Sequence, residues 1–434
     1  MNLHNICNSQ LSNAYGKLLN IFATNKALEI VPCFKLLLHL SKVRWLVRPI
    51  DDMRLLSNIL IKSRFFHHVL FVEIQDQFIG HLIPSYLFFK LNDMNSIDNV
   101  KRIVLVGASS KSSNQFLANQ IQTRKRRLLK PGRILRKLLI NSHLDSLHAY
   151  HDCNKNDFIT YHYLKTNSML LKRLQTSLLR EIDRKVLINH IPWYQTTKKI
   201  CVVHTRCNKY NAKTATFANN HDYEQTRNYD IQKLESSIRY LLDKGYFVIR
   251  SGIFVEKRLQ INCTDYIELA DYPTSLSEYL TILAFLSAKL VITTGSGVDA
   301  LCALNPDVTL GVLFQPHSLT SPYSIRQLFF PPLFYKDEIL LTPDQYLALD
   351  PIFSQEDLVK QGLSIYKPHD KVEEFIKELV EFSERDHILF NKASYHHPIY
   401  ADPLYNILAA KNNNMVNSPN WCLSNVYLNI FEKL

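Results

Sequence analysis

Apolar residues recur along the second half of the chain in two alternating patterns. Short runs rich in valine and isoleucine are typical of buried strands, whereas longer segments with apolar residues three and four apart are typical of helices. The predicted strands are 198–206, 246–252, 289–297 (which includes the turn after the strand) and 307–314, and the predicted helices are 228–245, 276–288 and 370–384. Strands and helices that alternate at these lengths predict a parallel, doubly wound α/β sheet.

The first half of the chain carries a weaker version of the same pattern. A β-branched run at 66–74 is followed by a turn with Gly80 and by a helical segment over 82–91, and a second strand is predicted at 102–107. The chain therefore divides into four predicted parts: a helical, basic extension over 1–60, an α/β domain over 61–190, a second α/β domain over 198–385 and a helical tail over 386–434.

Two of the ten glycines, Gly295 and Gly297, flank Ser296 directly after a predicted strand. Glycine allows a positive φ and a close approach to the main chain, and free N–H groups at a helix start attract anions. We therefore expect a phosphate or pyrophosphate cradle at Gly295–Gly297. The alternative is an ordinary strand-to-helix turn, which has the same appearance in any open α/β sheet.

Polar side chains follow the carboxyl ends of the neighbouring predicted strands. His204 and Arg206 end one strand, and Arg250 and Gly252 end the next. In a parallel sheet these positions gather at one edge, where ligands bind, and arginine forks suit a diphosphate. The alternatives are an arginine paired with a carboxylate inside the domain and a histidine hydrogen-bonded within the core. Near the start of the predicted helix at 228–245, we expect Asp230 to be an N-cap.

Charge and composition narrow the ligand class. The formal net charge of +12 predicts an anionic partner, and 46% hydrophobic residues exclude wholesale disorder. The basic run 122–140 alternates charge with leucine, which favours an anionic membrane surface; a solvated helix face and RNA are the alternatives, and the run lacks aromatic residues for stacking on bases.

The sequence lacks the motifs of several common enzyme classes and of membrane or secretory targeting. The eight cysteines form no CxxC pair, there is no HExxH or metal-binding Asp-x-Asp, and neither GxSxG nor a P-loop is present. We therefore expect no metal and no cofactor. No signal peptide or apolar segment of about 20 residues is visible, which predicts a cytoplasmic protein, peripheral at most on the inner face of the plasma membrane.

An ordered set of short segments resembles a bacterial family of glycosyltransferases found with surface-polysaccharide biosynthesis genes. The matching pieces are RPI near 50, FIGHL at 78–82, CVVHTR at 201–206, HDY at 221–223, RNYDI at 227–231, KGYFVIRSG at 244–252, LSEYLTILAFLSAKLVITTGSG at 276–297 and NSPNW at 417–421. The H-x-R at 204–206 is also similar to a strand end of fucosyltransferase-type enzymes. The chain departs from the family pattern in the EQT after HDY and in Ser251.

The resemblance implies a GT-B-like architecture, in which two Rossmann-like domains face each other across a cleft. It implies a metal-independent transferase of hexosyl or fucosyl type that moves a sugar from a nucleoside-diphosphate donor to a glycan or lipid-linked oligosaccharide acceptor, without nucleic acid. The alternative is a non-catalytic basic α/β protein that binds nucleic acid or anionic membrane. The predicted donor-binding residues are His204, Arg206, Arg227, Arg250, Gly252, Glu278, Gly295, Ser296 and Gly297, and the candidate catalytic bases are His81 and Asp222.

Overall fold

Contacts in the computed structural model divide the chain into two compact units, 1–152 and 153–434, and each is described by itself. The structure describes residues 69–73, 79–80, 82–83, 86–87, 90, 102–106, 114–122, 126–129, 168–186, 191–207, 226–253, 255–316, 323–324, 326–347, 349, 352, 355–384 and 421–432. The predicted extension over 1–60 lies outside these residues.

The first unit contains a parallel three-stranded sheet with the order β1-β2-β3. Its strands are Val69–Glu73, Arg102–Val106 and Arg126–Leu129. The first two confirm the predicted strands at 66–74 and 102–107. The third was not predicted, because it lies in the basic run 122–140. That run therefore contributes a strand to a sheet along Arg126–Leu129, where we expected a surface segment.

Two helical features accompany this sheet. Helix α5, Gln115–Ile121, begins at Asn114, whose side chain accepts a hydrogen bond from the Leu117 N–H at 2.9 Å. Gly80 is buried and helical, so the expectation that it forms the turn before a helix is wrong. Its neighbours Leu82 and Ile83 are fully buried, which places the apolar pattern of this segment in a core.

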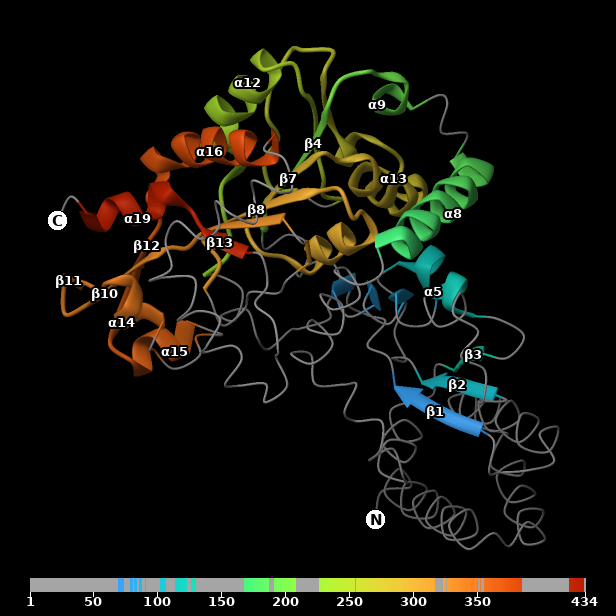
Figure 1. The fold of residues 1–434 in the computed structure, drawn as a ribbon, viewed down its shortest axis with the longest axis horizontal. Helices are drawn as coiled ribbons and strands as arrows, with labels where there is room; N and C mark the ends of the chain where they lie inside the picture. Colours follow the sequence, from blue (N-terminus) through green and yellow to red (C-terminus); the bar gives the residue numbers. More distant parts are fainter. Residues whose placement is uncertain are drawn as a thin grey trace, which may run out of the picture. The chain divides into compact units, whose positions relative to one another are not determined.

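The second unit is built on a seven-stranded sheet in which every neighbouring pair is parallel (Figure 1). Its order is β13-β9-β8-β7-β4-β5-β6. The strands are β4 Ile200–His204, β5 Phe247–Arg250, β6 Tyr266–Glu268, β7 Leu290–Thr293, β8 Thr309–Leu313, β9 Arg326–Phe330 and β13 Trp421–Leu423. The doubly wound, Rossmann-like α/β class predicted from the sequence is confirmed for this unit.

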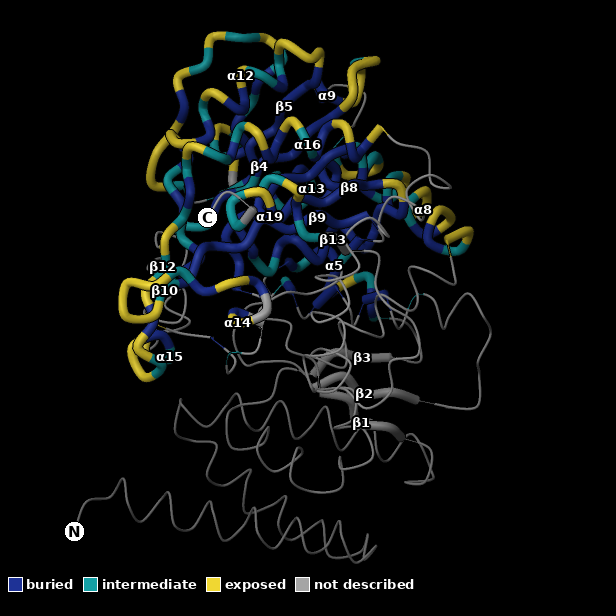
Figure 2. Tube along the Cα trace, turned by 60° about the vertical axis from the view of Figure 1, so that its left-hand side comes forward, coloured by how far each residue is buried: buried dark blue, intermediate teal, exposed yellow. Residues whose placement is uncertain are grey.

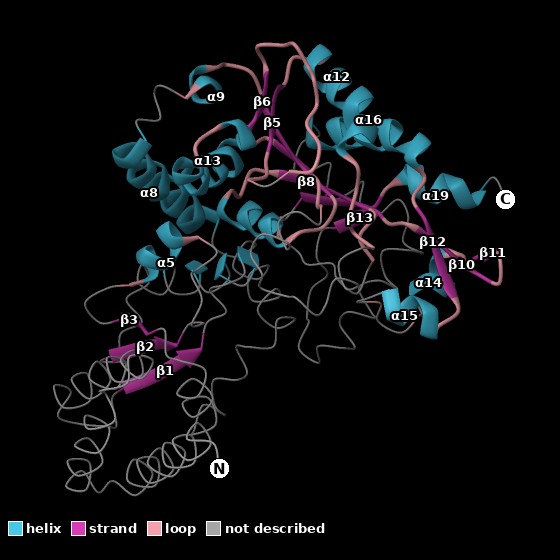
Figure 3. Ribbon diagram, turned by 180° about the vertical axis from the view of Figure 1, so that it is seen from behind, coloured by secondary structure: helices cyan, strands magenta, loops and turns pink. Residues whose placement is uncertain are grey.

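Helices cover both faces of this sheet, as Figures 1 and 3 show from opposite sides. Helices α12, Glu235–Asp243, and α16, Val372–Glu384, contact one face through β5 and β8. Helix α13, Thr274–Ser287, contacts β4 on the other face and packs against α8, Ser168–Val186. Within the contact between these two helices, Gln175 Nε2 donates to the Leu286 carbonyl at 2.7 Å. Helix α8 was assigned to the domain 61–190, but it packs within the unit 153–434.

Burial follows directly from this layering. All described residues of β5, β7, β8 and β9 are buried, because strands covered on both faces have no side exposed to water (Figure 2). Aromatic rings extend the core beyond the sheet, where Phe330 stacks on Phe375 of α16 with centroids 5.3 Å apart. Between the two predicted α/β domains lies the short helix α9, Pro192–Gln195, and its Trp193 is fully buried.

Residues from the predicted helical tail complete the sheet. Strand β13 pairs with β9, and helix α19, Asn425–Glu432, packs against α16. Glu378 of α16 fastens this segment by accepting hydrogen bonds from the Ser424 hydroxyl and from the Asn425 and Val426 N–H groups. The tail thus includes a strand that is part of the second unit.

The segment after β9 forms a small antiparallel sheet with the order β11-β10-β12. Its strands are β10 Leu333–Lys336, β11 Ile339–Leu340 and β12 Leu363–Tyr366. Helices α14, Pro343–Leu347, and α15, Gln355–Lys360, lie between β11 and β12 in the sequence. The 3-10 turn η11, His369–Lys371, then leads into α16. This sheet was not predicted.

Candidate functional site

The strand order of the large sheet identifies one place where a ligand crevice is expected. Read from β4, the order β6-β5-β4-β7-β8-β9 is the 3-2-1-4-5-6 order of dinucleotide-binding sheets, extended by β13. The chain runs outward from β4 through β5 and β6, then returns to β7 on the opposite side of β4. At such a reversal the loops after the two central strands part and leave a crevice at their carboxyl ends. We call this region, formed by 204–207 and 293–297, the switch point.

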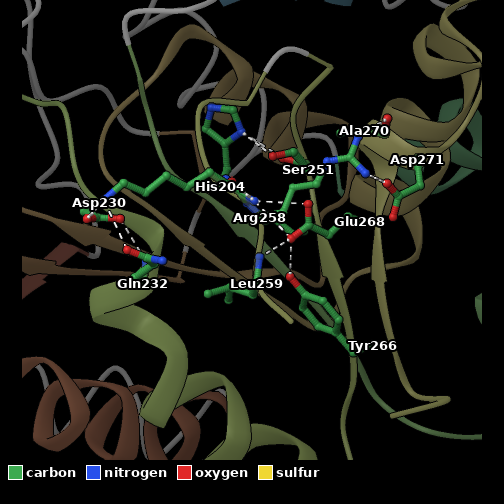
Figure 4. Close-up of polar contacts among 12 residues, drawn as sticks. His204, Asp230, Gln232, Ser251, Arg258, Leu259, Tyr266, Glu268, Ala270 and Asp271 are labelled. Atoms are coloured by element: carbon green, nitrogen blue, oxygen red, sulfur yellow. Dashed lines mark hydrogen bonds and ion pairs between the residues drawn. The ribbon is translucent and has the colours of Figure 1, made fainter. Parts of the chain in front are cut away.

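At the end of β4, His204 is fixed by Ser251 at the end of the neighbouring strand (Figure 4). Its Nδ1 lies 2.9 Å from the Ser251 hydroxyl and 3.3 Å from the Ser251 carbonyl oxygen. Because a carbonyl oxygen only accepts, this geometry favours the tautomer with hydrogen on Nδ1, which leaves Nε2 as an acceptor. Burial, followed by the positive charges of Arg206 and Arg250, lowers the pKa of His204 to about 4. The imidazole is therefore neutral near pH 7.

Two of the predicted arginines come together beside the glycine turn. Arg206 forms an isolated parallel bridge with Asn228, and its main-chain N–H donates to the Thr294 hydroxyl at 3.0 Å. Arg227 is buried and donates from Nη1 to the Gly295 carbonyl at 3.2 Å. The structure thus brings 206, 227 and 295 from three separate stretches of the sequence to the switch point.

The glycine turn itself is satisfied from within the protein. The Gly295 N–H donates to the Thr293 hydroxyl at 3.2 Å, and the Ser296 N–H donates to Asp299 Oδ2 at 2.8 Å. The Val298 N–H donates to the Ser296 hydroxyl at 3.2 Å. Ser296 and Asp299 therefore form a capping box at the start of η9, Gly297–Leu304. The expectation of free N–H groups is wrong for these three donors, since side chains already take the places of phosphate oxygens.

Asp299 brings a buried negative charge to the switch point. Its Oδ1 accepts the Thr293 hydroxyl at 2.7 Å, and its side chain is 4% exposed. Burial raises the pKa of Asp299 to about 6, although the hydrogen bonds from Ser296 and Thr293 and the charges of Arg227 and Arg206 act in the opposite direction. The carboxylate thus offsets part of the positive charge of the two arginines.

Arg250 forms the internal ion pair that the sequence left as an alternative. Its Nη1 lies 3.0 and 3.1 Å from the two carboxylate oxygens of Glu268 and donates to the Lys257 carbonyl at 2.6 Å. Glu268 Oε1 also accepts the Leu259 N–H and the Tyr266 hydroxyl, each at 2.9 Å (Figure 4). These contacts hold the irregular stretch between β5 and β6 against the sheet. Both charged side chains are only 4% exposed.

The remaining predicted donor-binding residues lie on the same edge of the sheet. Gly252 follows β5 with φ +141°, and Glu278 lies half-buried near the start of α13. Gly297 is the first residue of η9, and only Gly295 of the turn has a positive φ, +77°.

The two predicted bases, His81 and Asp222, lie outside the described residues. Asp230 accepts a hydrogen bond from the Gln232 N–H, which confirms it as an N-cap.

Sequence reasoning missed the acceptors and the acids of this region. Thr293, Thr294 and Asp299 were not singled out, although Ser296 followed three residues later by an acid is a recognisable capping pattern. Glu268 gave no local signal, because its role depends on the pairing of two strands. Its Cα partner in the β5–β6 ladder is Arg250.

Neither a metal centre nor a membrane span was found in the part of the chain that the structure describes. Among these residues, no three or more His, Cys, Asp or Glu side chains are grouped so that they could hold a metal ion. None of the described helices is long and apolar enough to cross a bilayer.

Comparisons with known proteins yield two solved structures. No family model matches the sequence, and no curated protein is significantly similar to it. One similar structure is E. coli ADP-heptose LPS heptosyltransferase II, with a TM-score of 0.35 and 13% identity over 67% of this chain and 98% of that one. Another is the glycotransferase of kitacinnamycin, with a TM-score of 0.28 and 9% identity over 79% and 95%. Both are glycosyltransferases.

Proposed function

We propose that the chain is a glycosyltransferase that moves a sugar from a nucleoside-diphosphate donor to a glycan acceptor. The observation that carries the proposal is the meeting of Arg206 and Arg227 at the switch point of a Rossmann-like sheet. A crevice at this place of such a sheet suits a nucleotide, and arginine suits its diphosphate. The transfer step rests on the sequence resemblance to glycosyltransferases of surface-polysaccharide biosynthesis, with a donor of hexosyl or fucosyl type.

The described side chains suggest how such a reaction proceeds without a metal. When the bond between the anomeric carbon of the sugar and the diphosphate oxygen breaks, negative charge grows on the departing diphosphate. Arg206 and Arg227 place positive charge where it develops, and such electrostatic stabilisation is usually the largest single term in catalysis. We assign Arg250 a supporting role, because its guanidinium is engaged by Glu268. The acceptor hydroxyl loses its proton to a base, for which His81 and Asp222 stay the sequence-based predictions.

The glycine turn at Gly295–Gly297 was expected to bind phosphate through free N–H groups, and we propose a structural role for it instead. Because Asp299 and Thr293 occupy its N–H groups, the turn shapes the floor of the crevice and orients Arg227 through the Gly295 carbonyl. We propose that the second unit binds the donor and that the first unit faces it as the acceptor side of a GT-B-like enzyme. We also propose that the enzyme acts at the inner face of the plasma membrane.

The competing function is a basic α/β protein that binds nucleic acid or anionic membrane without chemistry. Such binding depends mainly on the number of charges and weakens steeply as salt rises. It is indifferent to the base of a nucleotide and to the loss of one half-buried arginine.

A calorimetric titration separates the two functions. The wild-type protein is titrated with GDP, UDP, CDP, dTDP and CMP without added metal, together with Arg206→Gln and, as the control, Arg239→Gln. Arg239 carries the same charge but lies exposed on α12, paired with Glu235. We expect saturable binding of one nucleoside diphosphate, at least about tenfold weaker in Arg206→Gln because a charge-assisted hydrogen bond contributes about 1.5–3 kcal/mol. Absence of binding by every nucleotide, beside salt-sensitive binding to RNA or anionic vesicles, would contradict the proposal.

A further inference from the structure

Two lysines and a histidine gather where the loop after β4 meets the segment before α16. Lys233 belongs to the short helix η7, Ile231–Leu234, whereas Lys367 and His369 follow β12. Lys233 Nζ lies 2.8 Å from His369 Nε2, and Tyr229 Oη lies 2.9 Å from His369 Nδ1. Lys367 Nζ donates to the Asn228 carbonyl at 2.7 Å. We call Lys233, Lys367 and His369 the lysine cluster.

The lysine cluster carries positive charge that no carboxylate in the described part of the chain neutralises by an ion pair. Seven other described lysines form such pairs: Lys172, Lys198, Lys199, Lys257, Lys360, Lys371 and Lys377. Burial, followed by the charge of Lys233, lowers the pKa of Lys367 to about 8. Burial and both lysine charges lower the pKa of His369, and Asp370 raises it. The two lysine charges therefore repel each other while the fold holds them together, and Nε2 of His369 accepts a hydrogen bond from Lys233.

Packing beneath the cluster fixes this arrangement. The ring of His369 lies 5.2 Å from that of Tyr229 and 6.0 Å from that of Phe314, and both aromatic residues are buried. Phe314, directly after β8, has φ +56°, a left-handed conformation that is strained for a residue with a Cβ. Backbone strain of this kind persists where surrounding contacts impose it, and it is found at ligand sites.

The cluster adjoins the switch point through one residue. Asn228, whose carbonyl accepts Lys367, is the bridge partner of Arg206. The main chain at 227–229 therefore carries Arg227 toward the glycine turn on one side and supports the lysine cluster on the other.

We propose that Lys233, Lys367 and His369 form a second anion subsite, next to the switch point, that binds a phosphate group. Two lysine charges that repel each other beside a rigid aromatic floor gain most from an anion with two charges and several acceptor oxygens. This phosphate belongs either to the nucleoside diphosphate or to a separate phosphorylated molecule, and the two lysines would bind it in the same way in both cases. The inference does not depend on the glycosyltransferase proposal.

Lysine labelling of the wild-type protein tests the subsite without a mutation. The protein is acetylated briefly at pH 7.5 with and without inorganic phosphate or pyrophosphate, and modification of each lysine is quantified by mass spectrometry. We expect pyrophosphate to slow labelling of Lys233 and Lys367 at least threefold and to leave Lys336 unchanged. Lys336 is an exposed lysine of β10 without an ion pair among the described residues. Equal protection of all three lysines, or none, would overturn the proposal.

Calorimetry with variants supplies the second measurement. Lys233→Met and Lys367→Met are expected to weaken pyrophosphate binding at least fivefold each, whereas Lys336→Met binds as the wild type does. Equal affinities for all three variants would refute the subsite. Protection of Lys233 and Lys367 by a nucleoside diphosphate assigns the phosphate to the donor. Protection by inorganic phosphate that persists in saturating nucleoside diphosphate assigns it to another molecule. Protection by inorganic phosphate, with no nucleotide bound in any titration, supports the subsite and contradicts the proposed function alone.

Discussion

The buried pair of Arg250 and Glu268 should govern the stability of the second unit. We predict that Glu268→Gln is strongly destabilising, although glutamine has nearly the shape of glutamate. The substitution leaves the guanidinium of Arg250 buried without its counter-charge. The introduced glutamine would still offer one carbonyl oxygen at the position of Oε1, which accepts the Leu259 N–H and the Tyr266 hydroxyl.

The magnitude follows from what is lost and what is kept. Both side chains of the pair are 4% exposed, so water cannot replace the missing carboxylate. Breaking a buried ion pair by removing one partner typically costs about 3–5 kcal/mol. Because the two neutral hydrogen bonds to Oε1 can survive, we expect a loss near the lower end, about 3 kcal/mol.

Urea-induced unfolding followed by circular dichroism measures this loss. The matched control is Glu235→Gln, which breaks an exposed pair with Arg239 on α12 and should cost about 0.3–0.5 kcal/mol. The double variant Arg250→Met/Glu268→Gln removes both charges, and we expect it to be more stable than Glu268→Gln alone.

Two results would refute this reasoning. The first is a loss in Glu268→Gln no larger than that in Glu235→Gln, which would mean that the pair is hydrated in solution. The second is a double variant less stable than Glu268→Gln, which would mean that the cost arises from packing or from lost neutral hydrogen bonds. The first result would reopen Arg250 as a ligand of the donor diphosphate.

Two further predictions concern the switch point. The pKa of His204 in the folded protein, about 4, lies below its unfolded value near 6.5, so the unfolded chain takes up the proton first as pH falls. The stability of the wild type relative to His204→Asn should therefore be greatest above pH 6.5 and decrease by up to about 3 kcal/mol toward pH 4; a difference independent of pH would exclude the lowered pKa. Gly295→Ala should destabilise the protein by more than the roughly 1–2 kcal/mol of a positive φ, because its Cβ would lie 2.4 Å from Oε1 of the buried Gln315. Gly245→Ala, with φ +79° and open space around the Cβ, pays the backbone cost alone, so equal thermal midpoints of the two variants would contradict the close contact.

The sequence predicted those elements of the second unit whose own residues determine them. Strands β4, β5, β7 and β8 are continuous apolar runs, helices α12 and α16 carry a helical apolar period, and α13 is a long apolar segment, so local pattern and final fold agree. Strands β6 and β13 have three residues each and become strands only through their neighbours. No local pattern contains that information.

The candidate site divides in the same way. The positions of Arg206 and His204 could be predicted, because strand ends of a parallel sheet meet at one edge. The pairing of Arg250 could not, because it depends on the register that sets Glu268 opposite it in an unpredicted strand. The N–H groups of Gly295 and Ser296 were misjudged for a related reason. Their acceptors lie within three residues, but the choice between a phosphate and these side chains is made by the turn conformation.

The two outer strands of the large sheet also bear on how the protein avoids self-association. Open sheet edges are templates for pairing with another chain, and very short edge strands limit that risk. Both edges here, β6 and β13, are only three residues long. Next to β13 lies β9, a fully buried five-residue strand of sequence RQLFF that would become the edge if the β13–α19 segment detached. The hydrogen bonds to Glu378 therefore act as a latch against aggregation, and conditions that loosen them should produce fibrous or amorphous assemblies before the sheet itself unfolds.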